Sequence, residues 1–202
     1  MAACMVEIFS SFEWMHASAI LDQGEKMKRF IWIIVICLAA PVAARSRAPG
    51  ANPVSAKLRQ ILDDYSKDLV ATAEEMPAEK YSYHPKPEQM TFGKSVDHVA
   101  EVNNFVCSKI SGAAAPEGAK VSETDKDKLV EELKASMDFC KQAFSKLTDA
   151  ALGEQVPWFG GRQVTRVSAA LEVTNDLIDH SAALAVYLRL NNMVPPTAQP
   201  KK

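Results

Sequence analysis

The sequence predicts an all-α protein, a four-helix bundle of the up-down type, and three observations support this prediction. Four segments of about 20 residues repeat their apolar residues at helical spacing, and no strong strand pattern interrupts them. The connections between these segments carry proline, glycine and small residues, which end helices. The 202 residues are 48% hydrophobic and 24% charged, as in a globular protein with a substantial core. We therefore expect a bundle over residues 53–196.

The first two predicted helices span residues 53–75 and 92–110. In the first helix, the residues that recur at helical spacing are Leu58, Ile61, Leu62, Tyr65 and Leu69. Prolines 77, 85 and 87 exclude a continuous helix in the following loop. Thr91 is a suitable N-cap for the second helix. His98 lies on the flank of that helix's apolar face, so it points partly toward the core.

The third and fourth predicted helices span residues 124–146 and 171–192. Asp125 and Asp127 in the first turn of the third helix suit the helix dipole. Between the two helices, Gly160-Gly161 separates two short apolar runs, which indicates a hairpin-like turn. Asn191-Asn192 and then Pro195-Pro196 end the fourth helix.

Three polar residues follow one edge of the apolar stripe of the fourth helix. They are Asp176, His180 and Tyr187, and the stripe itself contains Val173, Leu177, Leu184 and Leu188. Asp176 and His180 are one turn apart at the border of the predicted core. This pair could supply two ligands to a metal ion.

Residues 27–44 have the three parts of a secretory signal peptide. A basic start at 27–29 precedes eleven apolar residues at 30–40, and Val42 and Ala44 occupy the small-residue positions before a cleavage site. This pattern predicts export, periplasmic or extracellular, after cleavage near Ala44. The apolar run is too short for a confident membrane span, so we expect no stable span after cleavage. The competing interpretation of this run is a buried core helix.

The remaining terminal segments carry little pattern. Residues 1–26 lie upstream of the signal and show no clear periodicity, so our hypothesis is that translation starts at Met27 and that 1–26 is an unstructured over-extension. Residues 45–52 are rich in proline, alanine and glycine and are predicted to be a linker. The tail at 197–202 is expected to be loose.

Charge and cysteine content narrow the classes of partner and compartment. The net charge of −2 and the scattered lysines and arginines exclude the basic surface that nucleic-acid binding requires. After cleavage only Cys107 and Cys140 remain. An exported protein with two cysteines is expected to form one disulfide, which here would join the second and third helices. The alternative is a pair of buried thiols.

Three stretches resemble the DinB-like family of four-helix bundles, and the resemblance covers roughly residues 53–196. The first is AEEMPAEKYSYHPKPEQMTFGKSVDHVAEVNNFVC at 73–107. The second is VPWFGGRQVTR at 156–166, which is similar to the segment before the family's last helix, and the third is the closing LIDHSAALAVYLRLNNMVPP at 177–196. The family name comes from a DNA-damage-inducible member and implies no contact with DNA.

The resemblance implies one divalent metal ion bound by three histidines. One histidine of the family comes from the second helix and two from an H-x-x-x-H on the last helix. His98 and His180 match two of these positions, and Asp176 stands at the third. The predicted metal ligands are therefore His98, Asp176 and His180. Two imidazoles and a carboxylate leave coordination positions open and suit Zn²⁺, Ni²⁺, Fe²⁺ or Mn²⁺.

The resemblance further implies a metal-dependent enzyme, either hydrolase-like or thiol-transferase-like, that acts on a small-molecule substrate. Glu101 and Glu172 are possible further ligands or outer partners of the metal, and Glu101 and Tyr187 are the candidates for proton transfer. Trp158 and Phe159 either line the mouth of a pocket above the metal or pack onto the end of the bundle. The alternative function is a non-catalytic bundle that binds a metal or small ligand, or that associates with itself as a homodimer.

Overall fold

The computed structural model describes residues 52–118 and 120–199. The predictions for residues 1–26, for the signal peptide at 27–44 and for most of the linker at 45–52 lie outside the described residues. Among the helices of the described ranges, none combines the length and apolar composition needed to cross a membrane.

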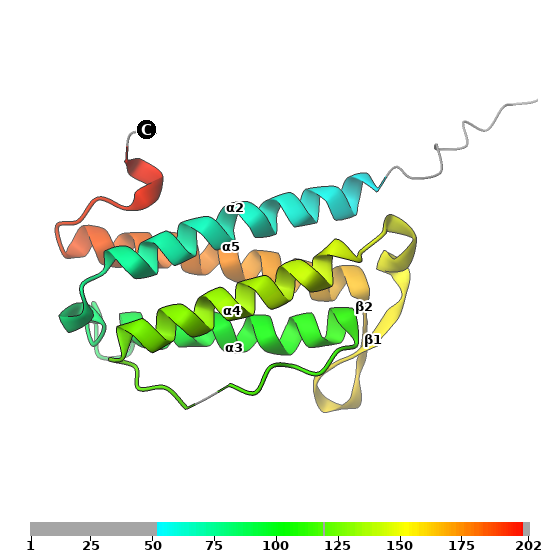
Figure 1. Cartoon of the computed structure of the whole chain (residues 1–202), viewed down its shortest axis with the longest axis horizontal. Coiled ribbons are helices and arrows are strands. Elements are labelled where there is room, and N and C mark those ends of the chain that lie inside the picture. The colour runs from blue at the N-terminus through cyan, green and yellow to red at the C-terminus, as the bar shows by residue number, and fades with distance from the viewer. Residues whose placement is uncertain (1–51, 119, 200–202) are drawn as a thin grey trace, which may run out of the picture. The chain divides into compact units, whose positions relative to one another are not determined.

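Four long helices form the fold, as the sequence predicts (Figure 1). They are α2 (Pro53–Glu75), α3 (Phe92–Ser111), α4 (Lys126–Ser145) and α5 (Arg166–Leu190). Helices α4 and α5 each pack against both α2 and α3, so α2 and α3 lie on one diagonal of the bundle. Short 3-10 helices occur at Ala78–Lys80, Asp149–Gly153, Phe159–Gly161 and Pro196–Ala198.

The direction of α4 differs from the predicted up-down order, because α3 and α4 run parallel (Figure 1). Thr91, which precedes α3, donates a hydrogen bond to Glu123, which precedes α4, at 2.9 Å. At the other end of both helices, Cys107 and Cys140 are covalently joined. The helices therefore run up, down, down and up.

The length of the connection from Ser111 to Lys126 makes this parallel order possible. An extended chain of this length reaches roughly 45 Å. A helix of 20 residues, such as α3, is about 30 Å long. The connection can therefore return along the whole bundle before α4 begins, and the sequence prediction was wrong because it assumed that consecutive helices reverse direction.

Gly93 allows this returning segment to pass against the start of α3. A Cβ atom at Gly93 would lie 1.8 Å from the carbonyl oxygen of Glu123. The backbone N–H of Gly93 also donates to the carbonyl oxygen of Tyr81 at 2.8 Å. Three segments thus meet at one residue that has no side chain.

Two helices begin at different residues from those predicted. Helix α4 begins two residues later than expected, since Asp125 is its N-cap and accepts a hydrogen bond from the N–H of Lys128 at 3.3 Å. Helix α5 begins five residues earlier, at Arg166, because the side chain of Thr165 accepts from the N–H of Ser168 and caps it. The last helix therefore starts directly where a strand ends.

The predicted hairpin is confirmed between α4 and α5. Strands β1 (Gln155–Pro157) and β2 (Gln163–Thr165) pair antiparallel, with Val156 opposite Val164. Gly160 and Gly161 form the tip with φ values of 64° and 74°, a left-handed conformation that favours glycine. Val156 is buried, so the hairpin is anchored to the helices.

The predicted disulfide is also confirmed. Cys107 on α3 and Cys140 on α4 are bonded, with their Cα atoms 5.2 Å apart, and both side chains are fully buried. They lie in a core whose largest fully buried side chains include Tyr81, Phe92, Phe144, Leu62 and Leu177. The disulfide therefore links the two parallel helices within the hydrophobic core.

Candidate metal centre

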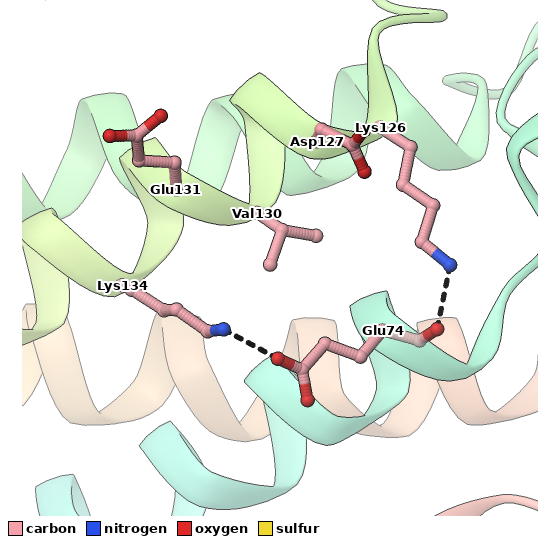
Figure 2. Close-up of a pocket in the computed structure, with 6 residues that line it drawn as sticks. All are labelled: Glu74, Lys126, Asp127, Val130, Glu131 and Lys134. Atoms are coloured by element: carbon pink, nitrogen blue, oxygen red, sulfur yellow. Dashed lines mark hydrogen bonds and ion pairs between the residues drawn. The ribbon is translucent and has the colours of Figure 1, made fainter.

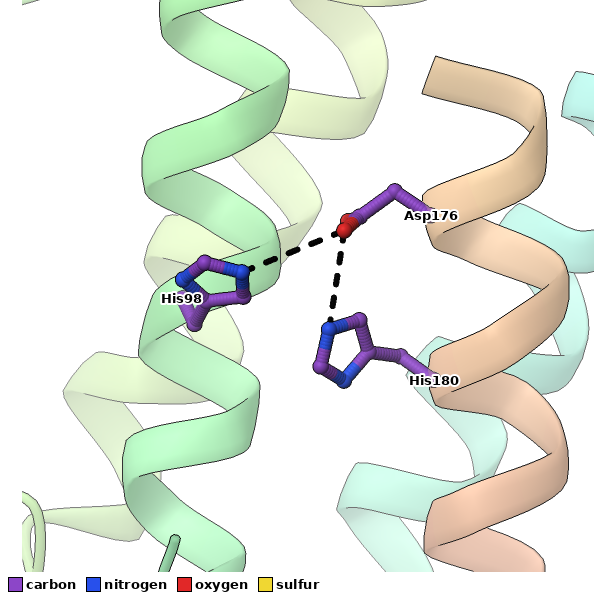
Figure 3. A group of neighbouring side chains, drawn as sticks. All are labelled: His98, Asp176 and His180. Atoms are coloured by element: carbon purple, nitrogen blue, oxygen red, sulfur yellow. Dashed lines mark ion pairs between the residues drawn. The ribbon is translucent and has the colours of Figure 1, made fainter. Parts of the chain in front are cut away.

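Helices α3 and α5 bring His98, Asp176 and His180 together. Figure 3 shows His98 extending from α3 toward the two residues on α5. Asp176 Oδ1 is 3.5 Å from His180 Nε2 and 3.9 Å from His98 Nε2. The two imidazole rings lie with their centroids 5.1 Å apart. One donor atom from each residue can be chosen so that all three lie within 4.8 Å of one another.

The helical periodicity explains why these side chains stand at the edge of the core. On α5, Val173 and Leu177 are fully buried and occupy the inner face. Asp176 and His180 lie one turn apart beside that face, and their side chains are 18% and 13% exposed. His98 is 35% exposed on the flank of α3. The site is therefore partly shielded from water but open on one side.

The carboxylate of Asp176 lacks adequate partners within the protein. Its Oδ2 atom is buried without a hydrogen bond, and both distances from Oδ1 to the imidazoles are longer than a good hydrogen bond. Burial raises the pKa of Asp176, and the nearby imidazoles oppose this shift when they are protonated. Glu172 and Asp179 raise the pKa further by charge repulsion. A cation bound at this point would offset the free-energy cost of burying a carboxylate whose hydrogen bonds are incomplete.

The three donors fit a divalent transition-metal ion. Imidazole nitrogen and carboxylate oxygen bind Zn²⁺ at about 2.0–2.2 Å, so neighbouring ligands of a tetrahedral ion lie roughly 3.3 Å apart. The donor separations here are of that order or somewhat larger. A small inward movement of the side chains would therefore complete the coordination geometry.

A pocket of about 330 Å³ opens beside His98. Its walls come from α3, from the hairpin and from the start of α5, and the residues are His98, Glu101, Val102, Phe105, Val106, Trp158, Phe159 and Glu172. Of the two roles left open for Trp158 and Phe159, the structure shows both residues lining a pocket next to His98 while they also pack on Phe105. The aromatic residues touch one another and form a continuous wall, which we call the aromatic wall (Phe105, Trp158 and Phe159).

A larger hollow of about 480 Å³ between α2 and α4 has a different character (Figure 2). Lys134 pairs with the carboxylate of Glu74, and Lys126 donates to the backbone carbonyl of Glu74 at 2.7 Å. The remaining lining residues are Asp127, Val130 and Glu131. No histidine or cysteine lines this hollow, and the lysines already have partners, so the chemistry favours the pocket beside His98.

Tyr187, a candidate for proton transfer, and His84 both lie outside the donor group and have contacts elsewhere. The hydroxyl of Tyr187 donates to the carbonyl oxygen of Met90 at 2.8 Å, and its ring packs edge-to-face on Tyr83. Tyr187 therefore fixes the loop before α3 to the end of α5. His84 lies in an exposed loop, where its Nδ1 is 2.8 Å from the carbonyl oxygen of Lys86. Neither residue belongs to the donor group.

Two further residues shape the site although the sequence did not single them out for it. Phe105 is a partly buried residue of α3 that packs against the core, and its ring stacks on Phe159 at 4.1 Å. Arg166 pairs with Glu154 at 2.7 Å and donates to the carbonyl oxygen of Ile110, so it ties the hairpin to the end of α3. An arginine directly after the hairpin's second strand was the available signal.

Comparison with known proteins gives a family match and two similar crystal structures. A sequence model of the DinB superfamily matches residues 61–183, which contain all three donors and the hairpin. A DinB-like protein from Bacillus subtilis is 17% identical with a TM-score of 0.59, over 72% of this chain and 99% of that one. A conserved protein from Enterococcus faecalis is 17% identical with a TM-score of 0.56, over 69% and 98%. None of the curated proteins matches this chain. At these identities the two structures show a shared fold.

Proposed function

Because the chain belongs to the DinB superfamily, we propose that it is a metal-dependent protein whose His98, Asp176 and His180 bind one divalent transition-metal ion, Zn²⁺, Ni²⁺, Fe²⁺ or Mn²⁺. The observation that carries this proposal is the buried Oδ2 of Asp176, which has no partner although two imidazole nitrogens lie close to the same carboxylate. Three protein ligands would leave coordination positions free for a small molecule.

We propose that the site acts on a small-molecule substrate that enters from the pocket beside His98. A bound divalent ion lowers the pKa of a coordinated water or thiol toward neutrality. The aromatic wall would hold and orient the substrate, because apolar contacts exclude water from that side. Glu101 lines the same pocket, and its carboxylate would accept a proton from the substrate or from the coordinated water.

We favour hydrolysis over thiol transfer because the protein is predicted to be exported to an oxidising compartment. The signal-like segment at 27–44 predicts export, and a core disulfide is typical of proteins in oxidising compartments. The low-molecular-weight thiols used by related transferases are cytosolic. Sequencing the N-terminus of the protein from its natural host tests this step: a start at Arg45 is expected, and peptides from residues 1–26 would contradict it.

Elemental analysis tests the metal site directly. We expect about one transition-metal ion per chain. His180→Ala and Asp176→Ala should lose it, and His84→Ala is the matched control because His84 is an exposed histidine outside the donor group. A parent protein that stays metal-free after reconstitution, or a His180→Ala variant that keeps its metal, would contradict the proposal.

The second candidate function, self-association as a structural domain, is favoured by the outer face of α5. Large apolar side chains there are 38–53% exposed, and they are Leu171, Ile178, Val186 and Leu190. A second copy packed antiparallel would bring Leu171 of each chain to Leu190 of the other and Glu172 to Arg189, which are opposite charges.

Light scattering combined with size-exclusion chromatography tests this second function. A dimer that Ile178→Glu converts to a monomer would support it, whereas a parent protein that is monomeric at high concentration would exclude it. Val54→Glu is a matched control, because Val54 is 47% exposed on α2 rather than on the outer face of α5.

A further inference from the structure

We propose that the pocket beside His98 selects a small organic cation, an aromatic or branched alkyl amine. Its apolar part would lie against the aromatic wall and its ammonium group between Glu101 and Glu172. This inference rests on the proposed function only for the role of the ligand beside a metal ion. The binding itself would use the pocket lining, which contains His98 but neither Asp176 nor His180.

The residues that line the pocket carry negative charge. Glu101 and Glu172 are the only ionised side chains of fixed sign in the lining, which contains no lysine or arginine. Lys94 approaches Glu101 at 3.6 Å but pairs more closely with Asp97, at 2.8 Å. Within residues 52–118 and 120–199, no lysine or arginine forms an ion pair with Glu172. The side chains that line the pocket therefore carry a net negative charge, which favours cations over carboxylates and phosphates.

The aromatic wall offers ring surface to the apolar part of a cationic ligand. The rings of Phe105 and Phe159 stack at 4.1 Å, and Trp158 meets both of them at steep angles. Phe159 is 56% exposed at the tip of the hairpin, so part of its surface is free for a ligand. Aromatic faces attract ammonium groups, and tryptophan does so most strongly. The combination of carboxylates and ring faces is therefore suited to a cation with an apolar body.

The protein's own contacts limit where a ligand can lie. The ring of Phe105 already holds the ammonium group of Lys109, whose Nζ is 4.9 Å from the ring centroid, so a ligand would use the free surfaces of Trp158 and Phe159. The wall is also built before any ligand arrives, because the buried Val156 and the contacts of Arg166 fix the hairpin against α3. A preformed wall lowers the ordering cost of binding.

The size of the pocket limits the ligand. A volume of about 330 Å³ is near the lower end for small-molecule sites, which range over about 300–1,000 Å³. This space suits one ring or a branched alkyl group with a short amine-bearing chain. Larger fused systems would extend beyond the wall into solvent.

Calorimetric titration with three probes of similar shape tests the inference. Phenethylamine carries a positive charge, 2-phenylethanol is neutral and phenylacetate is negative. With the full chain in its metal-free form, we expect phenethylamine to bind at least about fivefold more tightly than the alcohol, and phenylacetate to bind most weakly. Equal affinities for the amine and the alcohol, or a preference for phenylacetate, would overturn the inference.

Substitutions of two exposed side chains, Glu172 and Phe159, separate the contribution of charge from that of the aromatic wall without disturbing the core. Glu172→Gln should reduce the preference for the amine over the alcohol while leaving the alcohol's affinity unchanged. Phe159→Ala should weaken both probes. Glu88→Gln, in an exposed loop away from the pocket, should change neither. If the amine's affinity is the same in Glu172→Gln, in Phe159→Ala and in the parent, the probe is binding elsewhere and the inference fails.

The same titrations on His180→Ala distinguish this inference from the proposed metal site. A variant that has lost its metal but keeps the amine preference would support the inference and exclude coordination of the amine nitrogen as its cause. A parent that binds metal but shows no amine preference would overturn the inference and leave the metal site standing. A parent that shows the preference without binding metal would overturn the metal site and leave the cation pocket.

Discussion

At the scale of single residues, Asp176 is the position on which the chemistry of the candidate centre depends. It stands where the resemblance leads us to expect a histidine, and its buried Oδ2 has no partner. We expect Asp176→Asn to weaken metal binding by more than about tenfold, since the amide keeps the shape but loses the negative charge, and even outer partners of metal ligands change affinity about 10–100-fold. Asp176→His should retain the metal, because imidazole is a competent ligand.

Competition with a chromogenic chelator would measure both affinities. If Asp176→Asn binds as tightly as the parent, the carboxylate is not a ligand, and its burial then needs another explanation. Thermal unfolding of the metal-free variants provides the control, because it separates loss of a ligand from loss of the fold.

Tyr81 illustrates a residue whose role is confined to stability. It is fully buried and its hydroxyl donates to the carbonyl oxygen of Ala73 at 2.8 Å. Burial raises the pKa of Tyr81 above its ordinary value. A raised pKa in the folded state adds stability that is complete below about pH 10 and is lost as the pH rises beyond that value.

We therefore expect Tyr81→Phe to cost about 1 kcal/mol near neutral pH through the lost hydrogen bond. Above about pH 10 the difference between the variant and the parent should shrink, because the parent alone pays for keeping this phenol protonated. Urea unfolding at a series of pH values measures both effects. A difference that grows with pH would contradict the sign of this shift.

At the scale of elements, the start of α3 and the segment that returns from its end depend on Gly93. A methyl group there would meet the carbonyl oxygen of Glu123 at 1.8 Å. This clash can be relieved only if the backbone moves, because the carbonyl oxygen belongs to the main chain of Glu123 and not to a flexible side chain. We expect Gly93→Ala to destabilise the protein by about 1–3 kcal/mol, the usual range for inserting a methylene into a packed site.

Gly153→Ala is the matched control, because no atom lies within 4 Å of a Cβ built at Gly153. Chemical denaturation of both variants against the parent would show the difference. If both substitutions have the same small effect, the close approach at Gly93 does not constrain the fold.

The elements also show what the sequence could predict and what it could not. Apolar spacing placed His98, Asp176 and His180 at core borders, because position on a helix face follows from the 3.6-residue period. The start of α5 was misplaced, since the Thr165 cap follows a strand that contains no strong turn residue. The contact of Phe105 with the hairpin was not predicted, because periodicity describes one helix and contains no information about the hairpin that packs against it.

At the scale of the whole molecule, the direction of α4 was the main feature that the sequence left undetermined. A connection from Ser111 to Lys126 is long enough either to turn back at once or to cross the bundle, and apolar spacing is the same in both cases. Contacts distant in sequence decide between them. The hydrogen bond from Thr91 to Glu123 at one end and the disulfide at the other both hold α3 and α4 parallel.

The disulfide should therefore contribute to the stability of the whole fold. Cys107 and Cys140 are 33 residues apart, and closing a loop of this size is expected to stabilise the protein by roughly 3–4 kcal/mol in the loop-entropy model. Both cysteines are fully buried, so a reductant must reach them through an opening of the core. We expect reduction under partly denaturing conditions to lower the midpoint of urea unfolding.

The double variant Cys107→Ser/Cys140→Ser should unfold at a urea concentration at or slightly below that of the reduced parent. The further loss of stability would come from placing two hydroxyls in the core. Peptide mapping by mass spectrometry before and after reduction identifies the linked pair and excludes exchange with Cys4 or Cys37. A reduced parent, verified by mapping, that unfolds at the same midpoint as the oxidised protein would show that packing of α3 against α4 suffices. In that case the parallel order would be maintained by core packing, by the hydrogen bond from Thr91 to Glu123 and by the close approach at Gly93.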